Sequence, residues 1–316
     1  MKRRYGLFLC VLVLLAGCGS FPGYGEHSDV GMLIETTADD QGFGERGYEG
    51  LQMIEQEFDA DVYYKENIKT YDQTAAAVED LVHKGVDIIF GHGNIYESHF
   101  KELHASFPDV EFVYFNGEFS ADNVTSLNFS SRAMGFFAGM VAGEMTKSDK
   151  IGLIGAFEWQ PELEGFYEGV LYQNPEADVS VSLTNSWSDT QTALGIYSTM
   201  QRNGADVFYP AGDLFDISII KQAEQDGKYA IGYVKDRSSV AENAVLTSTI
   251  QRIDEVYELV MERYVDGNLT GGSLTFDFQE GAIEMGTYSS DVPVGFQKEM
   301  DEAVAYYEET GELPNR

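Results

Sequence analysis

The feature that most restricts the fold of this chain is a regular alternation of short apolar segments with helical ones, and this alternation occurs twice. The first series starts with the apolar segments Val30–Ile34 and Val86–Phe90, each followed by a helical segment, and the second starts with Lys150–Gly155. Strands that alternate with helices predict a parallel sheet covered on both faces. Two successive series therefore predict an α/β protein with two doubly wound parallel-sheet lobes.

The length of the chain agrees with two lobes, because 299 residues remain after residue 17 and exceed what one compact core usually holds. The sequence between the two series contains no proline-rich linker. We therefore expect the chain to cross between the lobes on strands. The expected division gives residues 29–128 and 246–272 to lobe 1, and residues 129–245 and 273–316 to lobe 2.

The amino terminus has the pattern of an export signal. Basic Lys2-Arg3-Arg4 precedes the apolar run Leu7–Leu15, and small residues lead to Cys18. The apolar run is shorter than the ~20 residues that a membrane-spanning helix needs. Leu15-Ala16-Gly17-Cys18 resembles a bacterial lipobox, which predicts a lipoprotein signal peptide at 1–17, lipidation of Cys18 and a tether at 18–28. The alternative is an ordinary cleaved signal peptide, with a cysteine near the cleavage site by coincidence.

Cysteine usage agrees with a lipid anchor. The chain contains only Cys10 and Cys18, so the expected folded domain has no thiol, and disulfides, thiolate catalysis and cysteine-ligated metals are excluded. A lipidated cysteine carrying two acyl chains gives stable anchoring. The sequence therefore predicts a protein on the extracytoplasmic face of the cell membrane.

The charge of the chain excludes one class of partner. The formal net charge is −33, and removal of residues 1–17 leaves 17 basic against 53 acidic residues, about −36. Such a field repels phosphate backbones, so we expect no nucleic-acid partner. The acidic residues are spread along the whole sequence, which we interpret as an adaptation to high salt.

The candidate binding residues lie in the loops that follow the expected strands, because doubly wound sheets bind ligands beyond the carboxyl ends of their strands. Two facing lobes would place such loops around a common cleft. Aromatic side chains in these loops suit a planar ligand, and nearby carboxylates accept its hydrogen bonds. The predicted ligand-binding residues are Asp40, Phe43, Gly93, Asn94, Trp159, Asp189, Asp213 and Asp236.

Alternative interpretations remain for these residues. The aromatic side chains, Phe157 and Trp187 included, could fill the cores of the lobes or the seam between them. Most carboxylates in so acidic a chain are solvated. Gly42–Gly47 has the formal spacing Gly-x-Gly-x-x-Gly, but it begins too far beyond the strand for a dinucleotide site and places Glu45 where a pyrophosphate would lie.

Enzyme motifs are missing from the sequence. No histidine pair has the helical spacing of a zinc motif, and neither a Gly-x-Ser-x-Gly elbow nor a Walker loop occurs. His92 is interpreted as a hydrogen-bonding loop residue and not as a base. We therefore expect no catalytic residue, no metal and no cofactor.

Several motifs resemble those of one family. From Val30 to Gly286 the chain resembles the basic-membrane-protein (purine-nucleoside-receptor-like) family of substrate-binding lipoproteins, and it is most similar to a Bacillus competence regulator in that family. The resemblance implies a type I periplasmic-binding-protein fold with a nucleoside in the cleft, Phe43 stacking on the base. The family motifs are Asp-Gln-Gly-Phe-Gly at 40–44, Asn-Val-Thr-Ser at 123–126, Gly-Phe-Phe-Ala-Gly at 135–139, Tyr-Ala-Ile-Gly at 229–232 and Val-Leu-Thr-Ser at 245–248.

Two positions depart from the family pattern. The aspartate and lysine that contact ribose in typical members align with Val234 and Gln251. Each lost charge-assisted hydrogen bond costs about 1.5–3 kcal/mol, so we expect the loss of both to weaken nucleoside binding by about a hundredfold or more. The resemblance thus implies a solute-binding protein that holds a small ligand, such as a nucleoside-like molecule, for an ABC permease. The alternative is a membrane-anchored regulator of competence genes that neither transports nor touches DNA.

Overall fold

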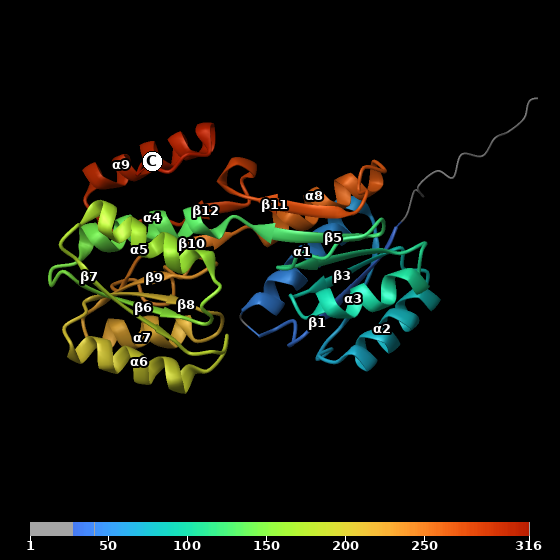
Figure 1. The fold of residues 1–316 in the computed structure, drawn as a ribbon, viewed down its shortest axis with the longest axis horizontal. Helices are drawn as coiled ribbons and strands as arrows, with labels where there is room; N and C mark the ends of the chain where they lie inside the picture. The colour runs from blue at the N-terminus through green and yellow to red at the C-terminus, as the bar shows by residue number, and fades with distance from the viewer. Residues whose placement is uncertain (1–27, 41, 316) are drawn as a thin grey trace, which may run out of the picture.

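The computed structural model describes residues 28–40 and 42–315, and these residues form two α/β lobes that lie side by side (Figure 1). The first sheet has the strand order β11-β5-β4-β3-β1-β2, and the second has β12-β10-β9-β8-β6-β7. Every pairing within the two sheets is parallel except that of β10 with β12. The expectation of two doubly wound, mainly parallel sheets is confirmed.

The first lobe is built on six strands: β1 (Asp29–Ile34), β2 (Asp61–Lys65), β3 (Ile88–His92), β4 (Glu111–Phe115), β5 (Val124–Phe129) and β11 (Gly272–Phe276). Both faces of its central strands are buried, because Met32 of β1 packs into one hydrophobic core and Leu33 into another. Its helices are α1 (Phe43–Phe58), α2 (Tyr71–His83), α3 (Tyr96–Leu103) and α8 (Ile253–Val265), with the short 3-10 helix η1 (His104–Ser106) after α3.

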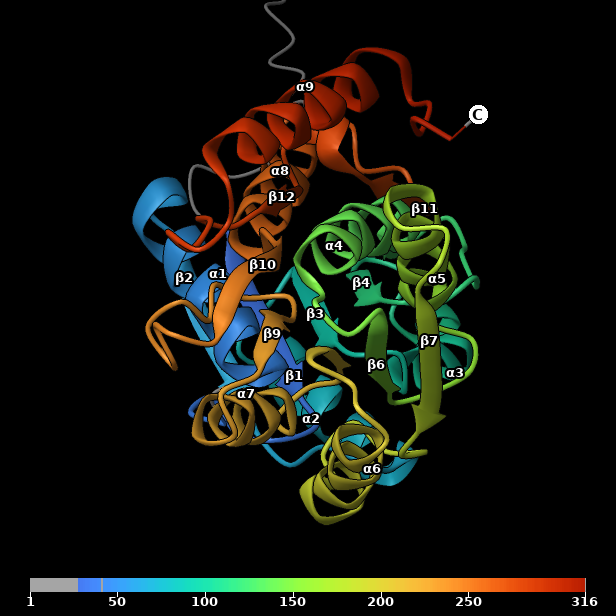
Figure 2. The same cartoon turned by 90° about the vertical axis from the view of Figure 1, so that its left-hand side faces the viewer.

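The second lobe repeats this plan. Its strands are β6 (Lys150–Gly155), β7 (Asp178–Leu183), β8 (Val207–Ala211), β9 (Tyr229–Gly232), β10 (Val245–Gln251) and β12 (Ile283–Met285). Figure 2 shows α4 and α5 on one side of this sheet and α6 and α7 on the other. The helices are α4 (Ser131–Met145), α5 (Pro161–Gln173), α6 (Thr190–Arg202), α7 (Asp216–Gln225) and α9 (Val294–Thr310), together with the 3-10 helix η2 (Phe278–Glu280).

The chain crosses between the lobes three times, and two crossings differ from the expected positions. The first follows β5, near the expected residue 129. The second was expected at residue 246, but β10 pairs with β9 and β12, so the chain returns to lobe 1 only at α8, which packs on α1. The third was expected after residue 272, but β11 pairs with β5. The pairing of β10 and β11 with strands distant in sequence determines where the chain crosses between the lobes. Local sequence does not reveal this pairing.

Helices α4 and α5 pack with almost no side chain between them. A Cβ atom added at Gly135 would lie 2.1 Å from the Glu162 carbonyl oxygen, and one at Gly169 would lie 1.9 Å from that of Phe136. Glycine therefore permits two backbones to approach closely. This contact matters for the cleft, because the first turns of both helices carry residues that line it.

Candidate functional site

A cavity of about 690 Å³ lies between the lobes. It is lined by residues that follow β1, β3 and β4 in the first lobe and β6, β7, β8 and β9 in the second, together with the ends of β5 and β10. This volume lies within the range of small-molecule pockets. Five predicted residues line it: Phe43, Gly93, Asn94, Trp159 and Asp213.

Phe43 forms the aromatic wall of the first lobe, and His92 supports it. The two rings stack with centroids 3.9 Å apart and planes 17° from parallel. The Nε2 atom of His92 lies 2.6 Å from the Phe43 carbonyl oxygen, and its Nδ1 atom lies 3.0 Å from the Tyr257 hydroxyl. Burial lowers the pKa of His92 to about 3, so the imidazole is neutral at physiological pH. His92 therefore positions Phe43 and leaves the other face of its ring for a ligand.

Three aromatic side chains form the wall of the second lobe. The rings of Phe157 and Trp159 are stacked with centroids 5.8 Å apart, and Trp187 meets both of them edge-on, at 5.3 and 5.7 Å. Trp159 is 57% exposed although it belongs to this cluster. An exposed indole beside a cavity offers a large apolar surface to a ligand. The aromatic residues of these loops therefore gather at the cleft.

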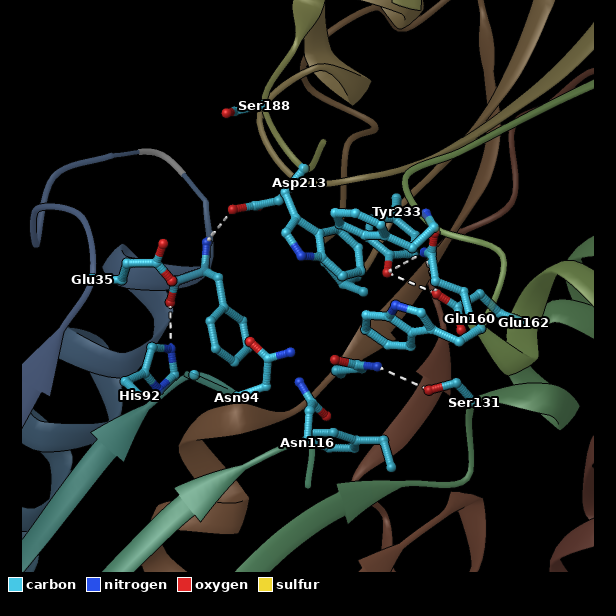
Figure 3. Close-up of a pocket in the computed structure, with 18 of the residues that line it drawn as sticks. Glu35, His92, Asn94, Asn116, Ser131, Gln160, Glu162, Ser188, Asp213 and Tyr233 are labelled. Carbon is cyan, nitrogen blue, oxygen red and sulfur yellow. Dashed lines mark hydrogen bonds between the residues drawn. The ribbon is translucent and has the colours of Figure 1, made fainter. Parts of the chain in front are cut away.

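A buried carboxylate lies beside this wall. Glu162 is 4% exposed, and its Oε1 atom accepts hydrogen bonds of 2.8 Å from Gln160 Nε2 and from the Tyr233 hydroxyl. Figure 3 shows these three side chains together on one side of the pocket, with Glu35, His92 and Asn94 on the other. Burial raises the pKa of Glu162 above its usual range.

Asp213 joins the two lobes. Its Oδ2 atom accepts a hydrogen bond of 3.1 Å from the backbone N–H of Phe43 (Figure 3). Burial, together with the negative charges of Asp40 and Asp216, raises the pKa of Asp213 to about 6. The Phe43 N–H and Arg237 oppose this shift. Asp213 is thus both a lining residue and an interlobe contact.

Two basic side chains add further contacts between the lobes. Arg46 of α1 donates to the carbonyl oxygens of Val234 and Gln251. Lys235 lies 2.7 Å from Glu45 and 3.6 Å from Glu49, both on α1. Together with Asp213, these side chains connect the two lobes beside the cavity.

Three of the predicted binding residues lie outside the cavity lining. Asp40 accepts hydrogen bonds from the backbone N–H groups of Gly42, Gly44 and Glu45, so its carboxylate caps the start of α1. Asp189 caps α6 by accepting from the Thr192 N–H at 3.0 Å. Asp236 accepts from the Ser238 N–H within its own loop. Strand-end carboxylates thus serve as helix caps and turn residues as well as cleft residues.

The two residues that depart from the family pattern do lie at the cavity. Val234 is 6% exposed and has a φ of +49°, which is unusual for a β-branched residue. The side-chain amide of Gln251 donates to the Ser131 hydroxyl at 3.3 Å. Neither side chain offers a charge at these two positions.

Other cavity residues were not predicted from the sequence. Asn116 and Glu118 follow β4, and Ser131 and Glu162 belong to the first turns of α4 and α5. Asn116 directly follows the buried strand β4, so the rule that strand-end loops bind ligands would have predicted it. Glu162 follows Trp159 by three residues, so extending the candidate loop into the next helix would have included it.

The described part of the chain has neither a metal-binding cluster nor a membrane-spanning helix. Residues 28–40 and 42–315 contain no group of three His, Cys, Asp or Glu side chains arranged to hold a metal ion. Within the same residues, no helix has the length and apolar character needed to span a bilayer. Cys18, the predicted signal peptide and the tether up to residue 27 lie outside the described residues.

Curated proteins similar to this chain include a regulator and a set of membrane proteins. Over 314 residues the chain is 44% identical to the transcriptional activator protein med of Bacillus subtilis (strain 168), covering 99% of each chain. It is 25% identical over 307 residues to basic membrane protein A1 of Borrelia garinii subsp. bavariensis, covering 93% of this chain and 90% of that one. The expected similarity to a Bacillus competence regulator is matched by the first of these.

Solved structures show the same fold. A transcriptional activator of the comK gene from Bacillus halodurans superposes with a TM-score of 0.86 at 39% identity, covering 91% of this chain and all of that one. A solute-binding protein of an ABC transporter system from Conexibacter woesei superposes with a TM-score of 0.73 at 20% identity, covering 91% and 99%. The type I periplasmic-binding-protein fold is therefore confirmed.

A family model described as "ABC transporter substrate-binding protein PnrA-like" matches residues 27–314, nearly the whole described chain. Its members are binding proteins and not enzymes, in agreement with the lack of catalytic motifs. The motifs that suggested this family in the sequence are distributed over both lobes. The chain therefore belongs to the basic-membrane-protein (Bmp) family of PnrA-like ABC transporter substrate-binding proteins.

Proposed function

We propose that this protein is a lipid-anchored extracytoplasmic receptor that closes its two lobes around a small ligand containing a flat ring. The observation that carries the proposal is the interlobe cavity, which has Phe43 on one wall and the cluster of Phe157, Trp159 and Trp187 on the other. Aromatic walls on both sides suit a ring that stacks between them. The lobes of such a fold close by hinge motion, and delivery to an ABC permease would follow.

The binding part of the proposal is tested with the full chain purified in detergent. Denaturing mass spectrometry would identify any small molecule that co-purifies, and calorimetry would measure its affinity. Phe43→Ala and Trp159→Ala should each weaken binding about tenfold, because each removes a stacking surface worth about 1–1.5 kcal/mol. Tyr306→Ala, an exposed aromatic on α9, is the matched control. Equal affinities for all four proteins would refute the proposed site.

The nature of the ring is tested with a nucleoside panel. The absence of charge at Val234 and Gln251 argues against tight nucleoside binding. Micromolar binding of adenosine, guanosine or inosine to the unmodified chain would contradict that argument. A gain of about a hundredfold in the Val234→Asp, Gln251→Lys double variant would support it.

The anchor is tested at the two cysteines. Cys18→Ser should release the protein from the membrane fraction into the medium, because the lipid-bearing thiol is lost. Cys10→Ser, in the expected signal peptide, should leave the protein in the membrane. Retention of the Cys18→Ser protein would contradict lipid anchoring at that residue.

A regulatory role is the second candidate, and the 44% identity to the Bacillus activator over the whole chain favours it. A protein of formal net charge −33 would relay its effect without touching DNA. Deleting the gene and measuring competence-gene expression tests this role. An unchanged transcript level together with lost uptake of the ligand would favour transport. A changed transcript level with uptake retained would favour regulation.

A further inference from the structure

The charged side chains that line the cavity within the described residues are all carboxylates. They are Glu35, Glu118, Glu162 and Asp213, and they come from both lobes. His92, the titratable ring at the cavity, is held neutral by burial. A ligand that enters the cleft therefore meets acidic groups on either side.

Basic groups close to the cleft are engaged elsewhere. Arg237, whose charge acts on Asp213, does not line the cavity and is paired with the buried Asp216 at 2.7 Å. The Arg46 guanidinium donates to two backbone carbonyls, and the charges of Asp254 and Glu49 act on it. Lys235 is paired with Glu45 and Glu49. Neither side chain lines the cavity.

Three helix amino termini near the cleft, those of α1, α5 and α6, carry the chain's own carboxylates, whereas that of α4 has no acidic residue in its first turn. An unoccupied helix amino terminus is a common anion site. Here Asp40 accepts the first N–H groups of α1, and Asp189 caps α6. Glu162 and Glu164 lie in the first turn of α5. An anionic ligand would meet like charge at each of these places.

Glu162 has the environment of a cation acceptor. A carboxylate that is 4% exposed and held by two neutral donors is expensive to ionise without a positive partner. A ligand ammonium group would supply that partner through a charge-assisted hydrogen bond, which is roughly twice as strong as a neutral one. The adjacent indoles add to this preference, since tryptophan is the best aromatic partner for a cation.

We infer that the cleft selects an organic cation, in which an amine is attached to a flat ring that stacks between the aromatic walls. This inference rests on the proposed function, because it specifies the ligand of the same cleft. The net charge of −33 acts in the same direction, by raising the concentration of cations near the protein.

The test compares probes that share one ring and differ in charge. Tryptamine is cationic, tryptophol is neutral and indole-3-acetate is anionic at pH 7.5. Calorimetry on the full chain in detergent should give at least tenfold tighter binding of tryptamine than of tryptophol, and no measurable binding of indole-3-acetate. The same order should hold for phenethylamine, 2-phenylethanol and phenylacetate.

The Glu162→Gln variant tests whether Glu162 is the residue that causes the preference for a cationic probe. It keeps the shape and should weaken tryptamine binding about tenfold while leaving tryptophol binding unchanged. Glu176→Gln, at an exposed position beyond α5, is the matched control and should leave both affinities unchanged. Thermal unfolding of each variant shows whether it is folded.

The outcomes separate the inference from the proposed function. If neutral probes or nucleosides bind as tightly as the amines, the inference is overturned and the receptor function stands. If Glu162→Gln and Glu176→Gln weaken tryptamine equally, the assignment to the cleft is overturned. If no probe binds and no small molecule co-purifies, the receptor function fails and the inference fails with it.

Discussion

At the scale of single residues, similar side chains take different roles because their surroundings differ. Asp40 and Asp213 both follow strands, and both were predicted to bind the ligand. Asp40 accepts three backbone N–H groups at the start of α1, whereas Asp213 lines the cavity and contacts the opposite lobe. The first arrangement is that of a helix cap, and the second places a carboxylate within reach of a ligand.

Replacing Asp40 with alanine should lower the free energy of unfolding by about 1–2 kcal/mol, because the first N–H groups of α1 lose their acceptor. Urea unfolding measures this loss. The neighbouring Asp39→Ala is the control, since Asp39 is exposed, and it should change stability little. A loss of ligand affinity without any loss of stability in Asp40→Ala would instead indicate a direct binding role.

Asp213→Asn should change how stability depends on pH. The pKa of Asp213 is about 6 in the folded protein against an ordinary value of 3.8, so the folded state binds a proton more tightly. This carboxyl therefore makes stability fall as pH rises from about 4 through about 6, and the fall levels off roughly one pH unit above. Burial is the main cause of this raised pKa, and the neighbours that modify it are the Phe43 N–H, Asp40, Asp216 and Arg237.

Asparagine cannot titrate, so the stability of the unmodified chain relative to Asp213→Asn should decline across that pH window. Urea unfolding at pH 4.5, 6 and 7.5 measures the difference. Asp236→Asn, at an exposed position in the next loop, is the control. A difference between the chain and Asp213→Asn that is constant with pH would show that Asp213 titrates normally.

At the scale of elements, the contact between α4 and α5 determines where the cleft residues lie. Gly135, Gly139 and Gly143 are spaced four residues apart on α4, and they face carbonyl groups of α5. Residues four apart share one side of a helix, so these glycines form a continuous strip. The close backbone approach fixes the first turns of both helices, and with them Ser131 and Glu162.

Gly169→Ala should destabilise the protein by about 1–3 kcal/mol, because its Cβ would lie 1.9 Å from the Phe136 carbonyl oxygen and force the helices apart. Gly195→Ala in α6 is the matched control. Its Cβ would have nothing within 4 Å, so the better helix propensity of alanine should stabilise the protein by up to about 1 kcal/mol. Thermal and urea unfolding compare the two, and equal effects would contradict direct backbone packing.

At the scale of the whole molecule, one contact between the lobes is made by residues beside the cavity. Gly42 and Phe43 of the first lobe approach Asp213 and Leu214 of the second. This contact is local, whereas one continuous hydrophobic cluster contains residues of both lobes, among them Met32 and Ile151. A substitution in the contact beside the cavity should alter the shape of the molecule more than its stability.

Gly42→Ala should favour the open form, because its Cβ would lie 2.5 Å from Asp213 Oδ1 and 2.7 Å from the Leu214 side chain. Small-angle X-ray scattering should show a larger radius of gyration, and ligand affinity should fall. Gly295→Ala at the start of α9 meets no atom within 4 Å and should change neither. An unchanged scattering curve for Gly42→Ala would show that closure does not depend on this contact.

The sequence was sufficient to predict the α/β class, the two sheets, the family, the lack of cysteine after residue 18 and the importance of strand-end loops. These predictions follow from periodicity, composition and local motifs, which depend only on residues that are close together in the sequence. The folded structure was needed to show that β10 belongs to the second sheet, that Asp40 caps a helix, and that Glu162 lies beside the cavity. The physical reason is that pairing, burial and the field at a carboxylate depend on atoms that are distant in sequence, and only folding brings them together.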